Sequence, residues 1–525
     1  MPKVLIADKM DKLAEDIFRA RGIDYDIKTG LSPEQLKEIV GEYDGIAARS
    51  SAKINADVIS AAGNVKVIGR AGIGVDTIDV PAATAAGIVV MNTPFGNSIT
   101  TAEHAISMMM ALARQIPQAN ESTHAGKWEK SKFMGVELYN KTLGVIGAGN
   151  IGGIVARRGL GLEMKVIAYD PFLSEEKARE LGIEKVELEQ LLERSDFITI
   201  HVPKTEKTNK MIDKAAIARM KRGVRIINCA RGGLIVEVDL KEALDSGHVA
   251  GAALDVFETE PATENILFNH PNVICTPHLG ASTSEAQVNV AIQVAEQMSD
   301  FLLTGAVSNA VNMPSITAEE APKLKPYMAL ATELGSFAGQ ITESAFKKVE
   351  IEYIGAAAKL NTRPLTACVL AALFKPMNDT VNMVNAPELA KTKGIVVSET
   401  KTENDAQWPV AIRLKIETEN GLRELTGTLF AGKEPRIVSV ENVPIEADLT
   451  EHMLFIRNED KPGMIGGLGT ILAEGGQNIA DFRLGRTEAG KTAVALVSLD
   501  APLSDELYEK VANLPQINKV KRLKF

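Results

Sequence analysis

Along the first 92 residues, short continuous apolar runs alternate with stretches in which apolar residues recur at helical spacing. Short runs rich in β-branched residues, such as KVLIAD at 3–8 and VKVIGRAG at 65–72, indicate buried strands. They alternate with amphipathic stretches such as DKLAEDIFRAR at 11–21, which predict helices. Strand and helix in strict alternation indicate βαβ units and a parallel sheet. The sequence therefore predicts a small α/β lobe at the start of the chain.

A second α/β series follows a long predicted helix at 99–115. Its strands are predicted at TLGVIG, KVIAYD, FITIHVP, VRIINCA, VAGAALDVF and NVICTPHLG, between residues 142 and 280. Another long helix, 284–303, is expected to return the chain to the first lobe. The second domain is therefore predicted to be inserted into the first, with the binding site in the cleft between them.

The remaining chain predicts two further domains. A proline-containing polar stretch at 309–325 marks a linker. The sequence from 326 to 447 predicts a helix followed by alternating strands, which indicates a compact α+β domain. From 452 to 525 the order is strand, helix, strand, strand, helix, strand, which is the ferredoxin-like βαββαβ plan.

Length and composition fit this division. A chain of 525 residues exceeds what one hydrophobic core usually supports, so several domains are expected. With 45% hydrophobic and 24% charged residues the chain resembles an ordinary globular protein, and no apolar run approaches the roughly 18 residues of a membrane span. The first strand begins without a basic leader or signal-type segment, so we expect a cytoplasmic protein.

The net charge and the cysteine content exclude some classes of ligand and cross-link. A net charge of −10 argues against binding to a nucleic-acid backbone, which needs a basic surface. Cys229, Cys275 and Cys368 have no ligand-like spacing, so neither a disulfide framework nor a metal site is expected. We interpret the three cysteines as small buried hydrophobic residues.

The stretch GAGNIGG carries the first chemical signal. Gly147, Gly149 and Gly152 stand between a strand and a helix, where glycines permit a tight turn and close approach of the backbone to a pyrophosphate. Asp170 ends the next strand, about 20 residues further on, where an acid accepts hydrogen bonds from a ribose. Pro171 and Phe172 follow it in place of arginines that would bind a 2′-phosphate. NAD is therefore favoured over NADP.

Three polar residues each lie just beyond a predicted strand: Arg231, Glu260 and His278. The carboxyl ends of parallel strands share one crevice, so these side chains are expected to meet there. A histidine titrates near neutrality and suits the base that takes a hydroxyl proton, and a carboxylate on its other nitrogen fixes the tautomer. An arginine binds a substrate carboxylate bidentately. The trio predicts hydride transfer from a hydroxy acid.

The nucleotide domain resembles the D-isomer-specific 2-hydroxyacid dehydrogenases. The resemblance rests on GVIGAGNIG, the acid of YDP, HVPKT, INCARGG, ALDVFETEP and TPHLGAST, in this order. It implies catalytic roles for Arg231, Glu260 and His278. Asn150 stands where the family commonly carries arginine. The cofactor-binding residues that the resemblance implies are Gly147, Gly149, Asn150, Ile151, Gly152, Asp170, His201, Pro203, Thr205, Ala230, Asp255 and Gly280, with Asp255 near the nicotinamide amide.

The substrate lobe is similar to that of the long-form D-3-phosphoglycerate dehydrogenases, a branch of that family. The motifs are AARSSAKI, GRAGIGVDTID and the loop GKWEKSKFMG. Lysines 130 and 132 could reach a phosphate, from a neighbouring subunit, or could equally be solvated loop residues. The substrate-binding residues that the resemblance implies are Arg49, Ser50, Arg70, Gly72, Lys130 and Lys132.

The last segment resembles an ACT domain, a small amino-acid-sensing module. The resemblance implies an L-serine site at Asn458, Asp460 and Asn478, and a homo-oligomer, with a tetramer expected. The region before it resembles the intervening domain of the long-form enzymes. The expected division is a substrate lobe at 1–95 and 285–312, a Rossmann-like NAD domain at 96–284, an intervening α+β domain at 313–450 and the ACT domain at 451–525.

The resemblance implies NAD-dependent oxidation of 3-phospho-D-glycerate to 3-phosphohydroxypyruvate, the entry to serine synthesis, with feedback by serine. Two alternatives stay open at this point. A glyoxylate or hydroxypyruvate reductase would share the fold and catalytic trio but need no site for a phosphate. An NAD-sensing interaction protein would use the same scaffold for a different purpose, because a fold does not fix a function.

Overall fold

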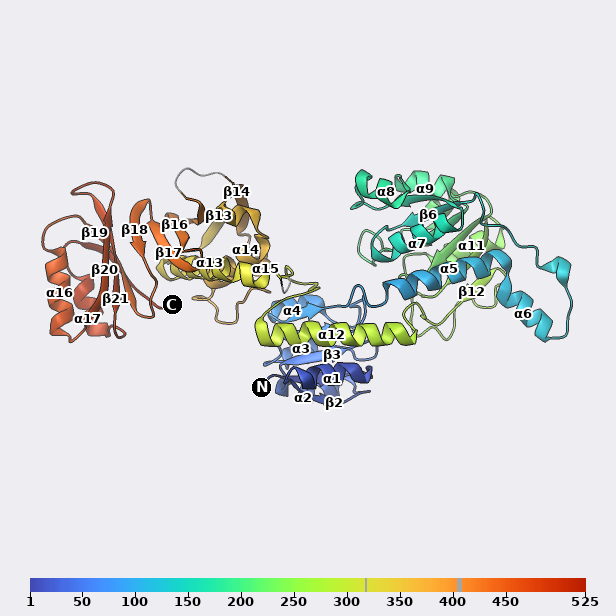
Figure 1. Ribbon diagram of the computed structural model, residues 1–525, viewed down its shortest axis with the longest axis horizontal. Helices are drawn as coiled ribbons and strands as arrows, with labels where there is room; N and C mark the ends of the chain where they lie inside the picture. Colours follow the sequence, from blue (N-terminus) through green and yellow to red (C-terminus); the bar gives the residue numbers. More distant parts are fainter. Residues whose placement is uncertain (317–318, 404–407) are drawn as a thin grey trace.

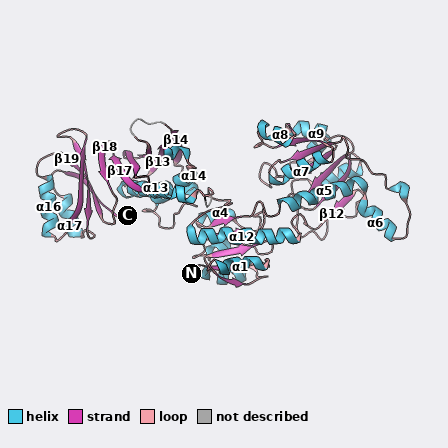
Figure 2. Ribbon diagram, in the orientation of Figure 1, coloured by secondary structure: helices cyan, strands magenta, loops and turns pink. Residues whose placement is uncertain are grey.

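The computed structural model describes residues 1–316, 319–403 and 408–525, and these residues form four β-sheets (Figures 1 and 2). Residues 317 and 318 of the predicted linker lie outside the described residues. The four sheets follow one another along the chain, and each lies within one of the four segments expected to form a domain.

The first sheet is parallel, with the order β2-β1-β3-β4-β5. Its elements are β1 (Lys3–Ile6), α1 (Lys12–Ala20), β2 (Asp24–Ile27), α2 (Pro33–Ile39), η1 (Val40–Glu42), β3 (Gly45–Ala48), α3 (Ala56–Ser60), β4 (Val67–Arg70), α4 (Val80–Ala85) and β5 (Val89–Met91). The later helix α12 (Ser284–Thr304) packs on this sheet, where Val294 and Met298 lie against Gly69. The chain thus returns to its first lobe, as predicted.

The second sheet is also parallel, with the order β12-β11-β10-β9-β6-β7-β8. Its strands are β6 (Thr142–Ile146), β7 (Lys165–Tyr169), β8 (Glu184–Lys185), β9 (Phe197–Ile200), β10 (Val224–Asn228), β11 (Val249–Leu254) and β12 (Val273–Cys275). Its helices are α5 (Ser98–Arg114), α6 (Ile116–His124), η2 (Lys130–Lys132), α7 (Asn150–Gly161), α8 (Glu175–Leu181), α9 (Leu188–Arg194), α10 (Lys214–Ala218) and α11 (Glu237–Asp245). This is the predicted Rossmann-like arrangement.

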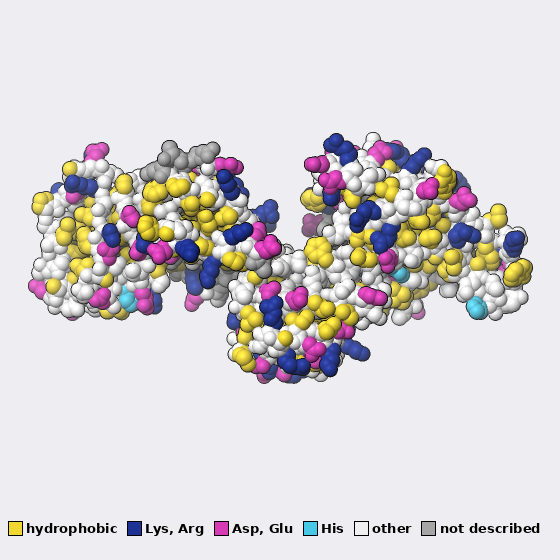
Figure 3. Space-filling view, viewed as in Figure 1, with side chains coloured by type: hydrophobic (Ala, Val, Ile, Leu, Met, Phe, Trp, Pro, Cys, Tyr) yellow, Lys and Arg dark blue, Asp and Glu magenta, His cyan; other side chains and the backbone are white. Residues whose placement is uncertain are grey.

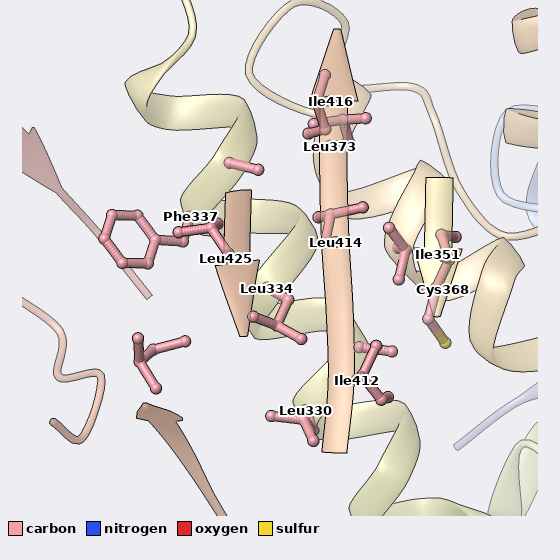
Figure 4. Close-up of a cluster of buried hydrophobic side chains, with 14 of the residues drawn as sticks. Leu330, Leu334, Phe337, Ile351, Cys368, Leu373, Ile412, Leu414, Ile416 and Leu425 are labelled. Atoms are coloured by element: carbon pink, nitrogen blue, oxygen red, sulfur yellow. The ribbon is translucent and has the colours of Figure 1, made fainter. Parts of the chain in front are cut away.

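The third sheet combines one parallel pair with antiparallel strands, in the order β14-β13-β15-β16-β17-β18. Its elements are α13 (Ala321–Ile341), β13 (Phe346–Gly355), η3 (Ala356–Lys359), α14 (Arg363–Phe374), α15 (Ala386–Thr392), β14 (Val396–Thr402), β15 (Val410–Thr418), β16 (Gly421–Phe430), β17 (Glu434–Val440) and β18 (Val443–Ala447). Figure 4 shows Leu330 and Leu334 of α13 beside Ile412 and Leu414 of β15. These side chains form the core of the domain.

The fourth sheet is antiparallel, with the order β20-β21-β19-β22. Its elements are β19 (Met453–Glu459), α16 (Met464–Glu474), β20 (Ile479–Arg486), β21 (Thr492–Leu499), α17 (Asp505–Ala512) and β22 (Ile517–Leu523). This βαββαβ order is the predicted ferredoxin-like plan. Its Phe455 ring meets Phe337 of α13 edge to face, with centroids 5.8 Å apart. The third and fourth sheets therefore share one hydrophobic core.

The third domain also touches the first lobe. The side-chain amides of Asn382 and Asn385 donate to the carbonyl oxygens of Gly87 and Ala85, at 2.9 and 3.4 Å, at the end of α4. Figure 1 shows the first lobe between the seven-stranded domain and the two C-terminal sheets. The lobe is thus in contact with both halves of the molecule.

One prediction about the cysteines is wrong. Cys229 and Cys368 are buried, but Cys275 is exposed. Cys275 ends β12, which is the edge strand of the seven-stranded sheet and so lacks a neighbouring strand on one side. Separately, no helix among the described residues combines the length and apolar character needed to cross a bilayer.

Candidate active site

The strand order of the second sheet fixes where its functional residues gather. The chain runs from β6 outward to β7 and β8, then crosses to β9 on the other side of β6 and continues to β12. The order therefore reverses between β6 and β9. In doubly wound parallel sheets the crevice beyond the carboxyl ends of the strands at such a reversal binds the ligand.

The glycine-rich turn leads from β6 into α7 at this reversal. Gly147 has φ +90° and donates its N–H to the carbonyl of Tyr169 at 2.8 Å, while Gly149 is the N-cap of α7. A Cβ on Gly152 would lie 1.8 Å from the carbonyl oxygen of Gly147, which leaves room for glycine alone. The turn thus brings the N-terminus of α7, with its unpaired N–H groups, to the crevice.

Asp170 faces this turn from the end of β7. Its carboxylate accepts hydrogen bonds from the backbone N–H groups of Ala148 and Phe172, both at 2.8 Å. The Phe172 side chain is almost fully exposed. The acid is thereby fixed beside the turn, the position at which a ribose-binding carboxylate is expected.

His201 follows β9 directly. Its backbone N–H donates to the Ile146 carbonyl at 2.7 Å, and its Nε2 lies 2.8 Å from the Thr199 hydroxyl. Burial lowers the pKa of His201 to about 4, so the ring is neutral at pH 7. Its Nδ1 is buried without a hydrogen-bond partner among the described residues. Because Nδ1 is enclosed by protein, this arrangement offers that atom to no ligand, and the cofactor contact of His201 stays a prediction.

Other cofactor residues implied by the resemblance lie in the segments that leave β9 and β10 and in the first turn of α7. Thr205 exchanges hydrogen bonds with Thr208, whose hydroxyl also donates to the Pro203 carbonyl at 2.6 Å. The Ala230 N–H donates to the Asn228 side chain at 3.0 Å. These contacts order the segments that leave β9 and β10. Ile151 is in the first turn of α7.

His278 and Glu260 form the predicted pair. The Nδ1 atom of His278 lies 2.7 Å from Glu260 Oε2, and the backbone N–H of Phe257 donates to Glu260 Oε1 at 3.0 Å. The hydrogen bond to Glu260 raises the pKa of His278 and outweighs the effect of burial, which lowers it. Because Nδ1 is engaged, Nε2 is the nitrogen available to take or give a proton.

Asp255 lies behind this pair. Its side chain is completely buried, and its Oδ1 accepts hydrogen bonds from the Thr276 hydroxyl at 2.6 Å and the Leu279 N–H at 2.7 Å. The Gly280 N–H donates to Oδ2 at 2.8 Å. The carboxylate is therefore bound to the loop that carries His278. Its predicted contact with the nicotinamide amide stays a prediction.

Arg231 reaches across the cleft between the two lobes. Its Nε lies 3.0 Å from the carboxylate of Asp76, in the loop after β4. One of its terminal nitrogens, Nη1, donates to the carbonyl of Ala230 at 2.7 Å. The guanidinium of the NAD domain and the carboxylate of the first lobe thus form an ion pair over the site.

The two substrate-lobe arginines stand on the same side of this cleft. Arg70 ends β4, and Arg49 follows β3, with its backbone N–H held by the buried carboxylate of Asp8 at 2.6 Å. Burial, together with the charges of Arg231 and Arg49, lowers the pKa of Arg70 to about 10. Its Nε is buried without a partner among the described residues. Three guanidinium groups therefore converge on one volume.

Two other predicted substrate residues shape this region. Gly72 has φ +144°, and a Cβ there would overlap the Arg70 guanidinium, so this position requires glycine. Ser50 is exposed on the loop after β3. By contrast, Lys130 and Lys132 lie exposed on η2, which follows α6 on the side away from the first lobe (Figure 1). The structure of one chain does not bring these lysines to the cleft.

Asn458 and Asp460 lie beside the beginning of β21 and Asn478 beside its end, so the predicted effector residues stand at opposite ends of the fourth sheet. Asn458 is buried on β19, and its Oδ1 has no partner among the described residues. Asp460 accepts hydrogen bonds from Arg486 at 2.7 Å and from the Gly490 N–H at 3.0 Å. Asn478 donates to Asp500 at 2.8 Å. Of the three side chains, only that of Asn458 has a buried oxygen without a hydrogen-bond partner in the described part of the chain, while Asp460 and Asn478 are hydrogen-bonded within the module.

Sequence reasoning left out three residues that the structure brings to the site: Asp8, Asp76 and His104. Asp8 lies two residues past the end of β1, so the strand-end rule that pointed to Arg231 could have found it. Asp76 and His104 had no such signal, because one contacts the opposite lobe and the other lies in the middle of α5.

Family models match two segments of the chain. Residues 106–280 match the NAD binding domain of the D-isomer specific 2-hydroxyacid dehydrogenases. Residues 323–441 match the D-3-phosphoglycerate dehydrogenase intervening domain. Among solved structures, a glyoxylate reductase from Paecilomyes thermophila is 32% identical with a TM-score of 0.55 and covers 59% of this chain and 97% of its own. D-2-hydroxyisocaproate dehydrogenase is 28% identical with a TM-score of 0.54, covering 59% and 99%.

Curated relatives match over nearly the whole length. The D-3-phosphoglycerate dehydrogenase of Synechocystis sp. is 44% identical, covering 100% of this chain and 95% of its own. That of Bacillus subtilis is 41% identical over 99% of both chains, and that of Archaeoglobus fulgidus is 42% identical over 98% of both. With its two-lobed fold and its NAD-binding domain, the chain belongs to the D-3-phosphoglycerate dehydrogenase family of the D-isomer-specific 2-hydroxyacid dehydrogenases.

Proposed function

We propose that this protein oxidises 3-phospho-D-glycerate to 3-phosphohydroxypyruvate with NAD, the first step of serine synthesis. The observation that carries the proposal is the meeting of three arginines with the His278–Glu260 pair at the mouth of a dinucleotide crevice. A substrate with a carboxylate at one end and a phosphate at the other needs several cations, whereas an uncharged alcohol needs none. The relatives named D-3-phosphoglycerate dehydrogenase support the same reaction.

The reaction removes a hydride from C2 of the substrate and a proton from the hydroxyl oxygen on that carbon. NAD, held by the glycine-rich turn and Asp170, would supply the acceptor for the C2 hydride, and Nε2 of neutral His278 takes the hydroxyl proton. Glu260, 2.7 Å from Nδ1, then stabilises the imidazolium that forms. The two steps convert the hydroxyl carbon to a carbonyl without a free charge on oxygen.

The arginines divide the anionic ends of the substrate between them. Arg231 binds the carboxylate, and Asp76, its present partner, is exposed enough to be displaced. Arg49 and Arg70 bind the phosphate. Burial is the main cause of the lowered pKa of Arg70, and the charges of Arg231 and Arg49 add to it, so a dianionic phosphate relieves an existing repulsion.

Substrate discrimination tests the proposed reaction. The protein should form NADH with 3-phosphoglycerate at a far higher kcat/KM than with D-glycerate or D-lactate. Replacing Arg49 by Gln should raise the KM for 3-phosphoglycerate about 10- to 150-fold, the equivalent of a charged hydrogen bond worth about 1.5–3 kcal/mol, and leave the KM for D-glycerate unchanged. Steady-state absorbance of NADH measures both.

Lys66→Gln is the matched control, because it removes one positive charge from the same lobe at the opposite end of β4. It should leave both KM values unchanged. Equal turnover of phosphorylated and unphosphorylated acids, or preferential reduction of glyoxylate, would contradict the proposed substrate and favour a glyoxylate reductase. Absence of turnover with every hydroxy acid would favour an NAD-sensing interaction protein.

The acid limb of the pH profile tests the catalytic pair. His278 works as a base only when neutral, so kcat/KM rises as the pH passes its pKa. The Glu260 hydrogen bond raises that pKa, and Glu260→Gln should therefore move the midpoint to lower pH. The same change should lower kcat on the order of 100-fold, because the imidazolium loses its counterion.

His278→Ala is the reference for this experiment. It should lower kcat by about 10²- to 10⁴-fold and remove the acid limb, while NADH binds as before. A midpoint that stays in place in Glu260→Gln would show that another group titrates in this range.

Adjacent glycines of α7 provide a test of the dinucleotide turn. A Cβ on Gly152 meets the Gly147 carbonyl oxygen at 1.8 Å, whereas one on Gly153 meets the Ala148 carbonyl oxygen at 3.5 Å, an ordinary contact. Gly152→Ala should weaken NADH binding roughly 5- to 150-fold, which corresponds to an overpacking cost of about 1–3 kcal/mol. Gly153→Ala should bind NADH normally. Fluorescence titration compares the two, and equal affinities would count against this binding site.

We further propose that the fourth domain is an ACT module that binds L-serine and that the protein is a homotetramer. The βαββαβ order and the buried, unpartnered Oδ1 of Asn458 support the first proposal. Exposed Ile116, Trp128 and Met134, on the segment that includes α6 and η2, support an interface with a second copy. Such a contact would also allow Lys130 and Lys132 to serve a neighbouring cleft.

Feedback is tested by activity with and without L-serine. Serine should lower the rate, and Asn478→Ala should raise the half-inhibitory concentration about 10-fold or more, because it removes a polar contact to a charged ligand. Asn513→Ala, which changes an exposed asparagine at the end of α17, is the matched control and should leave inhibition unchanged. A rate indifferent to serine would contradict the regulation but not the enzyme.

A further inference from the structure

The loop that carries His278 is held in an unusual backbone conformation. His278 has φ +56°, in the left-handed region that non-glycine residues rarely adopt. Such a residue is strained and persists only where its surroundings over-determine its conformation. Part of the support is the backbone of Asp255, whose carbonyl accepts the His278 N–H at 2.9 Å.

The Asp255 side chain supplies the rest of that support. Its two oxygens accept the N–H groups of Leu279 and Gly280 and the hydroxyl of Thr276, so the carboxylate binds the loop on both sides of His278. Burial raises the pKa of Asp255, but these hydrogen bonds and one from His104 lower it below its ordinary value. The group is a buried anion whose position fixes the loop.

His104 is the residue outside the loop that reaches this anion. It lies in the middle of α5, and its Nε2 is 3.2 Å from Asp255 Oδ1 and 3.2 Å from the Thr276 hydroxyl. The preceding residue, Glu103, forms an ion pair with Arg158 of α7 at 2.7 Å, which ties α5 to the helix of the glycine-rich turn. His104 therefore links a rigid helix pair to the catalytic loop.

The hydrogen-bond geometry assigns the proton on His104. A carboxylate accepts only, and the Thr276 hydroxyl already donates its hydrogen to Asp255 at 2.6 Å. Both oxygen atoms near Nε2 are therefore acceptors toward it. Nε2 must carry a hydrogen, and the ring acts as a donor whether it is neutral or charged.

We propose that His104 is a positioning residue of the proposed hydroxy-acid oxidation, which holds the Asp255 carboxylate from α5 and through it fixes the loop of His278. The inference rests on the proposed function for its assay. It assigns His104 no contact with substrate or cofactor. His104 supplies a donor of fixed position on α5, and a side chain without a donor there leaves the buried Asp255 Oδ1 held only by groups of the loop itself, Thr276 and Leu279.

A metal ion is a poor alternative at this place. The ligand atoms of His104, Cys229 and Asp255 lie within 4.8 Å of one another. However, burial, followed by the charge of Asp255, raises the pKa of the Cys229 thiol, which keeps it protonated. The Thr276 hydroxyl and the N–H groups of Leu279 and Gly280 already donate to the two Asp255 oxygens. Their positively polarised hydrogens would repel a cation bound there.

The experiment compares two replacements of His104. His104→Phe keeps a flat ring without a donor, and His104→Gln places an amide donor close to the position of Nε2. The Phe variant should lower kcat on the order of 10-fold, the effect of a small misplacement of a catalytic group, with the Kd for NADH within about 2-fold of the unaltered protein. The Gln variant should recover most of that loss.

The pH profile separates positioning from general destabilisation. The charged groups that face His278 are Glu260, Asp255 and Arg231, and the Glu260 hydrogen bond makes the largest contribution to raising its pKa. A loosened loop weakens that bond, so the acid limb of kcat/KM should move to lower pH in the Phe variant and return in the Gln variant. Loss of folded protein alone changes the amount of activity and leaves the midpoint where it is.

Thr276→Val tests the same carboxylate from the loop side and is used also if the Phe variant does not fold. It should lower kcat and displace the acid limb in the same direction. His124→Gln, an exposed histidine of α6, is the matched control. Unchanged kcat and midpoint in both His104→Phe and Thr276→Val would overturn the proposal, as would equal losses in His104→Phe and His104→Gln.

Different results would contradict the proposed substrate and the proposed role of His104. If the unaltered protein is inactive on 3-phosphoglycerate but oxidises another D-hydroxy acid, the proposed substrate is wrong, and the same variants are measured with that acid. If the unaltered protein is active on 3-phosphoglycerate and His104→Phe has its full kcat and its midpoint, the inference is wrong and the proposed function stands.

Discussion

The candidate site depends on one geometrical constraint, the common direction of the strands in the seven-stranded sheet. Parallel strands end at the same edge, so residues that leave β9, β10, β11 and β12 meet although the chain separates them widely. His201, Arg231, Asp255 and His278 all follow these strand ends. An antiparallel sheet of the same composition would distribute these side chains over two opposite edges.

A second constraint is charge. The three arginines stand in a cleft between the lobes. Two carboxylates, Asp8 and Asp76, lie near them, but only Asp76 forms an ion pair with one of the arginines. Asp8 is committed to the backbone N–H groups of Arg49 and Ala52, and Asp76 is largely exposed and paired with Arg231. Positive charge therefore remains around Arg70, whose pKa is lowered mainly by burial and further by the charges of Arg231 and Arg49. A multiply charged anion fits such a site better than a neutral ligand does.

Much of this architecture could be predicted from the sequence. The two parallel sheets, the return of α12 to the first lobe and the βαββαβ order are confirmed, because each depends on local periodicity and on chain order. The strand-end rule also pointed to Arg231 and His278, whose surroundings the structure now describes. Their catalytic roles stay predictions until activity is measured.

The sequence could not reveal contacts that depend on packing between distant elements. Nothing local marks His104, because a histidine within an amphipathic helix has the same appearance whether it meets solvent or a buried carboxylate. No local pattern marks Asp76 either, because its partner, Arg231, lies in the other lobe. The exposure of Cys275 was missed because its place on an edge strand follows from strand order and not from composition.

The contacts of the third domain decide how a distant ligand could reach the cleft. Asn382 and Asn385 hold the end of α4, and Asp79 caps the beginning of that helix through the Ala82 N–H at 2.9 Å. The loop before Asp79 carries Asp76, the partner of Arg231. This is a continuous series of rigid contacts from the third domain to the substrate site. A continuous series alone transmits no free energy, because both ends must bias the same two-state element. The series ends at the loop between β4 and α4, where Asp76 joins the first lobe to Arg231 of the other, so the relative position of the lobes is the equilibrium on which an effector in the C-terminal half would have to act.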